Sequence, residues 1–172
     1  MLSFNPDSIA VALKDPYPPI AATRPNSAYA QMMSNNLAAI NSEMTAINQY
    51  LYQSWILKES CPQLSTLLLR ISQVEMRHFN TFGQLVFLLG KLPKYQVSQN
   101  CQCAPWNANM INYTQDLHSL LHANLSAEKH AVEIYTKQAQ SVQDPCVSAS
   151  LARIVKDEQL HVKIFEDILC SL

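Results

Sequence analysis

Apolar residues recur at every third or fourth position in four long segments of the chain. This spacing places them along one face of an α-helix. Prolines and a glycine separate the segments, and these residues favour helix starts and helix ends respectively. The pattern therefore predicts four amphipathic helices, over about 27–59, 62–90, 112–140 and 144–170.

Helices that each carry one apolar face pack together as a four-helix bundle. Few residues separate the first helix from the second and the third from the fourth, so each pair should form an antiparallel hairpin. Residues 91–111 are then a long crossover between the hairpins. Five of the nine prolines lie in the first 25 residues. We therefore expect an extended N-terminal arm over 1–26 and an all-α bundle domain over 27–172.

The two hairpins resemble each other in sequence. Each half carries a glutamate, a tyrosine seven positions later, and a Glu-x-x-His in the following helix. The two sets are Glu43, Tyr50, Glu75 and His78 in the first half, and Glu128, Tyr135, Glu158 and His161 in the second. A bundle with approximate twofold symmetry would bring the two sets face to face at its centre.

The glutamates and histidines of this repeat lie on the apolar faces of their helices. Four buried carboxylates without partners would be costly and would repel one another, whereas two divalent metal ions would balance their charge. A glutamate and a histidine three positions apart project from the same helix face, so both can reach one site. One glutamate from each of two helices and a Glu-x-x-His from each of the others is the di-iron or di-manganese carboxylate arrangement.

These residues predict a site for two metal ions per chain, either iron or manganese, because mixed oxygen and imidazole ligands suit both. We assign three kinds of ligand: bridging Glu75 and Glu158, terminal Glu43 and Glu128, and one histidine for each metal, His78 and His161.

Tyr50 and Tyr135 lie two helical turns beyond the terminal glutamates. Each either hydrogen-bonds a ligating carboxylate or is a core tyrosine with a satisfied hydroxyl. The matched pair Arg70 and Arg153 is expected on the solvated helix surface rather than beside the ligands.

Other residues with metal-binding chemistry fall outside this pattern. Three histidines are expected at the surface because they lie off the stripe of Glu128: His118, His122 and His130. Cys101 and Cys103 form a Cys-x-Cys in the crossover. A closed zinc or iron site needs four ligands, so we interpret these two cysteines as incidental, with a redox or metal role as the alternative.

The pattern resembles the ferritin-like superfamily, most closely its rubrerythrin-like and manganese-catalase-like branch. The resemblance covers about 27–169 and rests on Glu43, Glu75-Met-Arg-His78, Glu128 and Asp157-Glu158-Gln-Leu-His161. It implies a ferritin-like fold and an oxidoreductase that acts on hydrogen peroxide or dioxygen in oxidative-stress defence. Peroxidase, catalase and ferroxidase reactions all stay open, and a non-catalytic iron-binding or storage protein is the alternative. A reductase would also need an external electron donor.

The composition of the chain indicates which kinds of binding partner to expect. The formal net charge of −1 argues against a nucleic-acid surface. Only 15% of the residues are charged, so we expect part of the surface to be covered in a homo-oligomer, with a dimer favoured. The apolar runs are too short to cross a bilayer. Neither a signal-peptide pattern nor a disulfide framework is visible, which favours the cytoplasm.

Overall fold

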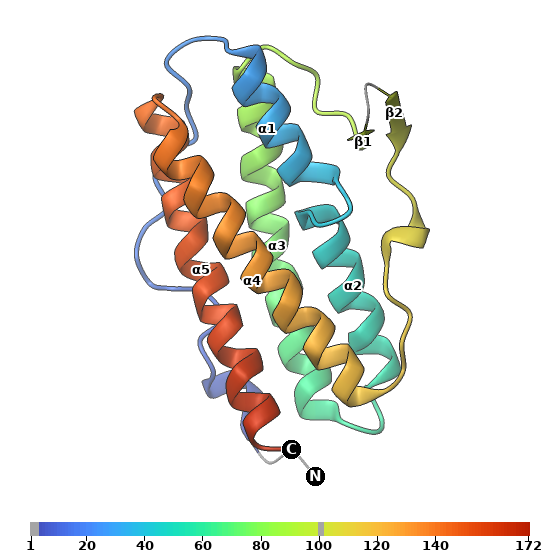
Figure 1. Ribbon diagram of the computed structural model, residues 1–172. Helices are drawn as coiled ribbons and strands as arrows, with labels where there is room; N and C mark the ends of the chain where they lie inside the picture. The colour runs from blue at the N-terminus through green and yellow to red at the C-terminus, as the bar shows by residue number, and fades with distance from the viewer. Residues whose placement is uncertain (1–3, 100–101) are drawn as a thin grey trace.

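The computed structural model of this protein describes residues 4–99 and 102–172. In these residues the α-helices are α1 Ser27–Ala38, α2 Glu43–Ile56, α3 Pro62–Leu88, α4 Leu117–Ser141 and α5 Pro145–Cys170. The helices α1 and α2 follow each other along one side, so together they form one column of a four-column bundle (Figure 1). The all-α four-helix bundle is thereby confirmed.

Local sequence signals explain where most helices begin. Pro62 and Pro145 are the first residues of α3 and α5. The carboxylate of Asp144 accepts from the first free N–H groups of α5, as an N-cap should. The helix α4 begins later than predicted, at Leu117, because Asn112 is held by α2. Gln49 Nε2 donates to Asn112 O at 2.7 Å, and Asn112 N donates to Gln49 Oε1 at 2.7 Å.

The first predicted helix is interrupted, and the prediction of one continuous helix over 27–59 was wrong. Residues 39–42 break it, with Ser42 extended (φ −141°, ψ 169°) and its hydroxyl donating to Ala39 O at 2.7 Å. The apolar spacing runs through the break by way of Ile40, but that side chain is 52% exposed. The break makes Glu43 the first residue of α2.

Two amide pairs, one buried and one partly buried, show why the helix is interrupted between Ala38 and Glu43. Asn36 exchanges two hydrogen bonds with Gln138, and Asn124 exchanges two with Gln53. The two asparagines are therefore equivalent in the half-repeat. Asn36 precedes Glu43 by seven positions, whereas Asn124 precedes Glu128 by four. Three extra residues would lengthen a continuous helix by about 4.5 Å, and the break absorbs them.

The crossover contains a small β-hairpin that the apolar spacing did not predict. The strands β1 Gln96–Gln99 and β2 Gln102–Pro105 pair antiparallel, with Gln96 opposite Pro105. Trp106 Nε1 then donates to Thr45 Oγ1 at 2.9 Å, which fixes the crossover to α2.

The apolar core falls into two clusters along the length of the bundle. One cluster includes Phe82, Leu85 and Leu151, and the other includes Leu67, Leu121 and Phe165. On α3 and α5 the predicted metal ligands lie between these two sets in sequence. The polar centre of the bundle is thus closed off by apolar packing on both sides.

Residues 4–26 form an arm whose described part contains one short 3-10 helix, Pro6–Ser8. The arm follows α5 on the outside of the bundle (Figure 1) and then enters α1. Arg153 holds it, since Nε donates to Asp15 O at 3.0 Å and Nη2 donates to Leu13 O at 2.9 Å. The expectation of a solvated Arg153 was wrong, because this side chain is 5% exposed. Arg70 is half-buried and donates to Pro6 O.

The helices of the described residues differ from membrane-spanning segments. None of these helices combines the length and the hydropathy that crossing a bilayer requires.

Candidate metal centre

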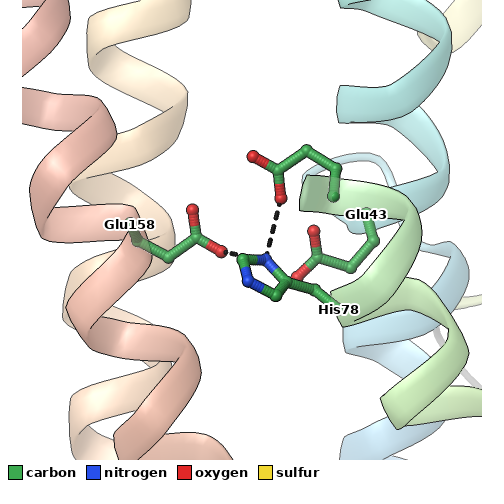
Figure 2. A group of neighbouring side chains, drawn as sticks. Glu43, His78 and Glu158 are labelled. Carbon is green, nitrogen blue, oxygen red and sulfur yellow. Dashed lines mark hydrogen bonds and ion pairs between the residues drawn. The ribbon is translucent and has the colours of Figure 1, made fainter. Parts of the chain in front are cut away.

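The six side chains predicted as metal ligands all lie together in the middle of the bundle. Each is at most 3% exposed. Glu43 on α2, His78 on α3 and Glu158 on α5 point toward one another in the space between the helices (Figure 2). The ligand atoms form two groups, each within 4.8 Å: Glu43, Glu75, His78 and Glu158 in one, and Glu75, Glu128, Glu158 and His161 in the other.

Both histidines direct Nδ1 into the carboxylates. His78 Nδ1 lies 3.0 Å from Glu75 Oε2 and 3.0 Å from Glu158 Oε1. His161 Nδ1 lies 3.0 Å from Glu75 Oε1 and 3.2 Å from Glu158 Oε2. Each histidine therefore contacts both glutamates of the Glu-x-x-His motifs, including the one on the other helix.

The opposite ring nitrogens, Nε2, point away from the cluster. His78 Nε2 lies 3.3 Å from Asp157 Oδ2 and 3.3 Å from the hydroxyl of Tyr17. His161 Nε2 lies 2.8 Å from the backbone oxygen of Val11. Because carbonyl and carboxylate oxygens only accept, each Nε2 carries the proton, and in the neutral rings Nδ1 is free to bind a metal.

Sequence reasoning missed these outer partners. Asp157 had a signal, because it directly precedes Glu158 on the buried face of α5. Tyr17 and Val11 had none, since they lie in the arm and reach the histidines only through the fold.

The two tyrosines of the half-repeat contact the terminal glutamates of the opposite half. Tyr135 on α4 donates to Glu43 Oε1 on α2 at 2.8 Å. Tyr50 on α2 donates to Glu128 Oε1 on α4. Of the two readings of these tyrosines, the geometry favours hydrogen bonding to a carboxylate of the cluster.

Burial and charge shift the proton affinities of the cluster in opposite directions. Burial raises the pKa of Glu43 well above its ordinary value, and it raises the pKa of Glu128 to about 7. Burial also acts on Glu75 and Glu158, but the adjacent histidines outweigh it and their pKa values are lowered. The carboxylates in turn outweigh burial at both histidines, whose pKa values are raised well above the ordinary range.

Two oxygens at the centre support the fit to metal ions. Among the described residues, Glu75 Oε1 and Glu158 Oε1 are buried without a hydrogen bond. Glu158 Oε1 lies 3.0 Å from His78 Nδ1, and Glu75 Oε1 lies 3.0 Å from His161 Nδ1, so each can form an ion pair with a protonated histidine. Buried carboxylate oxygens of this kind require a cation. A divalent metal would take the place of the histidine protons, so the donor set fits such ions.

A cavity of about 300 Å³ leads to this cluster from the side of α2 and α4. Its buried lining includes four glutamates and both tyrosines: Glu43, Glu75, Glu128, Glu158, Tyr50 and Tyr135. Its exposed lining includes Ile40, Ala127 and His130. The volume is roughly ten times that of one water molecule in the liquid, about 30 Å³, so molecules as small as peroxide or dioxygen fit easily.

The remaining histidines are not part of the cluster. The histidines expected at the surface are exposed, and their prediction is confirmed: His118, His122 and His130. His130 nevertheless lines the cavity. Cys103 is exposed, while Cys101 lies outside the described residues, so their expected incidental role stays a prediction.

Comparison with protein families gives one clear match. The rubrerythrin family matches residues 35–169, a range that contains all six clustered ligands and both tyrosines.

Individual proteins resemble this chain in sequence or in fold. A protein described as a probable manganese catalase, from Clostridium acetobutylicum, is 26% identical over 87% of this chain and 74% of its own. The structure of the manganese catalase KatB from Anabaena PCC7120 superposes with a TM-score of 0.80 at 21% identity, over 92% of this chain and 78% of that one.

Bacterioferritins share the fold as well. The bacterioferritin BfrA of Mycobacterium tuberculosis gives a TM-score of 0.69 at 24% identity, over 86% of this chain and 87% of that one. These superpositions confirm the ferritin-like fold that the sequence resemblance implied.

Proposed function

The chain belongs to the rubrerythrin family, and on this basis we propose that it is an oxidoreductase that binds two metal ions and acts on hydrogen peroxide or dioxygen. Defence against oxidative stress is the use that we propose for it. The metals are iron or manganese.

The observation that carries this proposal is the composition of the two ligand groups. They share Glu75 and Glu158, and each adds one glutamate and one histidine of its own. In our proposal the shared glutamates would hold both metals. Glu43 and His78 complete one metal position, and the other is completed by Glu128 and His161.

Bound there, the metals would supply Lewis acidity and redox electrons. The residues of the chain position and enclose them. The hydroxyls of Tyr50 and Tyr135 hold the terminal carboxylates from the opposite helix. Glu43 also lies at the N-terminal end of α2, where the helix dipole favours a negative charge. The cavity provides a route for a small molecule, while the apolar clusters keep bulk water out.

The first experiment is metal analysis of protein purified without added metal, followed by a peroxide-consumption assay with an oxygen electrode. Two manganese ions per chain and oxygen release would identify a catalase, in line with the name of the C. acetobutylicum relative. Two iron ions and peroxide consumption without oxygen release would identify a peroxidase that needs an electron donor. Less than about half a metal per chain after reconstitution would refute the proposal.

Iron binding or storage without catalysis is the second candidate, and the likeness to bacterioferritin structures favours it. Electron microscopy separates the two candidates, because storage requires a hollow shell. Hollow particles with a metal core would replace the enzyme proposal, whereas dimers without a core would support it.

We also propose a homodimer in the cytoplasm. In support of the dimer, several large apolar side chains are more than 60% exposed: Trp55, Phe87 and Leu92. Burial of such groups between two copies would be favourable. Light scattering at micromolar concentration tests the dimer, and a monomer there would exclude it.

A further inference from the structure

The half-repeat differs at a buried position next to the ligands. The residue that precedes the glutamate of each Glu-x-x-His is Val74 in α3 and Asp157 in α5. The ligands themselves are matched in the two halves. Their immediate surroundings are therefore different, although the cluster looks symmetric.

On the side of α5, Asp157 supports His78. Asp157 is fully buried and accepts a hydrogen bond from Leu13 N–H on Oδ1 at 2.8 Å, and its Oδ2 forms an ion pair with Arg153 Nη1 at 2.8 Å. Tyr17 donates its hydroxyl to the same Oδ2. His78 Nε2, 3.3 Å from Oδ2, therefore faces a carboxylate that is paired with a guanidinium group.

On the side of α3, Val74 offers no polar group to His161. The arm provides one instead, because Val11 O lies 2.8 Å from His161 Nε2. Val11 and Val74 line the same cavity beside Arg70, so the arm passes over the position that corresponds to Asp157. His161 therefore faces a neutral carbonyl group, supplied by a segment outside the bundle.

We propose that the N-terminal arm completes the metal centre and that its two metal positions are unequal. An imidazole that donates to a carboxylate is a stronger metal ligand than one that donates to a neutral carbonyl. The position of Glu43 and His78 is the tighter one. The position of Glu128 and His161 is the weaker one, and its histidine depends on the Val11 carbonyl of the arm. This inference rests on the proposed binding of two metals.

The test is a titration of the metal-free, full-length protein with Mn²⁺, in which electron paramagnetic resonance measures the free ion. We expect two separate binding steps. Crystals grown with one equivalent of Mn²⁺ should show the anomalous peak beside His78. A stronger peak beside His161, or a single step with both metals equivalent, would overturn the inference.

Variants of the carboxylate test the tight step. Asp157→Asn should weaken it by about 10–100-fold and leave the weak step unchanged. The matched control is Asp167→Asn, an exposed aspartate on the same helix that pairs with Lys163. Should Asp157→Asn not fold, Tyr17→Phe removes only one donor and should weaken the same step by a smaller factor. Equal weakening of both steps would contradict the proposal.

Variants of the arm test the weak step. Deletion of residues 2–12 removes the Val11 carbonyl but retains Leu13, Asp15 and Tyr17. Arg70→Met is the milder change, since it removes only the donor to Pro6 O. Both should weaken the second step and spare the first. A protein that binds neither Mn²⁺ nor Fe²⁺ would refute the proposed function, whereas two binding steps that none of the variants changes would refute the inference alone.

Discussion

Tyr135 donates its hydroxyl hydrogen to Glu43 at 2.8 Å, from α4 to α2 across the cavity. Its counterpart Tyr50 does the same for Glu128 in the opposite direction. Neither terminal carboxylate can turn away from its position without breaking a hydrogen bond to the other half of the bundle. Each half of the repeat thus orients a ligand of the other.

Loss of one such hydroxyl should affect turnover more than metal content. We expect Tyr135→Phe to retain two metals per chain and to consume peroxide about 10-fold more slowly, in the range usual for groups that orient metal ligands. Metal analysis and initial rates measure the two effects. Tyr113→Phe, at a side chain that is 50% exposed, is the control. Unchanged turnover in Tyr135→Phe would show that the hydroxyl only fills the core.

Removing one shared carboxylate should disturb both metal positions. Glu158 belongs to both ligand groups, so Glu158→Gln, which keeps the shape and removes the charge, should leave less than about one metal per chain. The comparison is Glu166→Gln, at an exposed glutamate of the same helix that pairs with Lys129. Metal analysis after dialysis gives the answer. Retention of both metals by Glu158→Gln would refute the assignment of Glu158 as a bridge.

Filling the cavity should block access without removing the metals. Ala127 is an exposed residue of the cavity wall, and Ala127→Phe places a large ring there. We expect kcat/KM for peroxide to fall by about tenfold, or roughly 1.4 kcal/mol, at unchanged metal content. Ala152→Phe, at an exposed position on α5 outside the cavity lining, should have no such effect. Equal rates in both variants would mean that substrate enters elsewhere.

The metal-free protein should lose stability as the pH rises through neutrality. Folding raises the pKa of Glu128 from 4.5 to about 7. The protonated side chain therefore stabilises the folded state fully below pH 4.5, and this stabilisation is lost as the pH rises to 7. The pKa values of His78 and His161 are also raised, so their stabilisation of the folded state is lost in the same direction, as the pH rises above 6.5. The pKa values of Glu75 and Glu158 are lowered, so these two side chains change the stability of the folded state only below pH 4.5.

Thermal unfolding with and without metal measures this effect. The Tm of the metal-free protein should fall between about pH 5 and pH 8, because the folded state holds protons that the unfolded chain releases. The metal-bound protein should not show this fall, since metal replaces those protons. A Tm of the metal-free protein that rises over this range would contradict the description of the cluster.

The sequence predicted the centre of the bundle better than its periphery. Helical spacing and the half-repeat located the ligands, because a buried charge on an apolar face has few explanations. The sequence showed Asp157 beside Glu158 but did not predict its contact with His78, because that contact depends on the orientation of the His78 ring. The contact of Val11 with His161 is a backbone contact and has no side-chain signature. The only sequence signal of the break before Glu43 was the longer spacing between Asn36 and Glu43. That signal was easy to overlook because the helical spacing of apolar residues continues through the break.

The two amide pairs bear on how a molecule reaches the interior. Asn36–Gln138 and Gln53–Asn124 join the first column to α4, on the N-terminal and C-terminal sides of Glu43. Each pair exchanges two hydrogen bonds, so the columns are tied above and below the opening. Such ties resist a hinge-like separation of the columns. Passage to the centre then depends on fast rotations of side chains at the rim, and the size limit for entering molecules is set by rotamers rather than by helix movement.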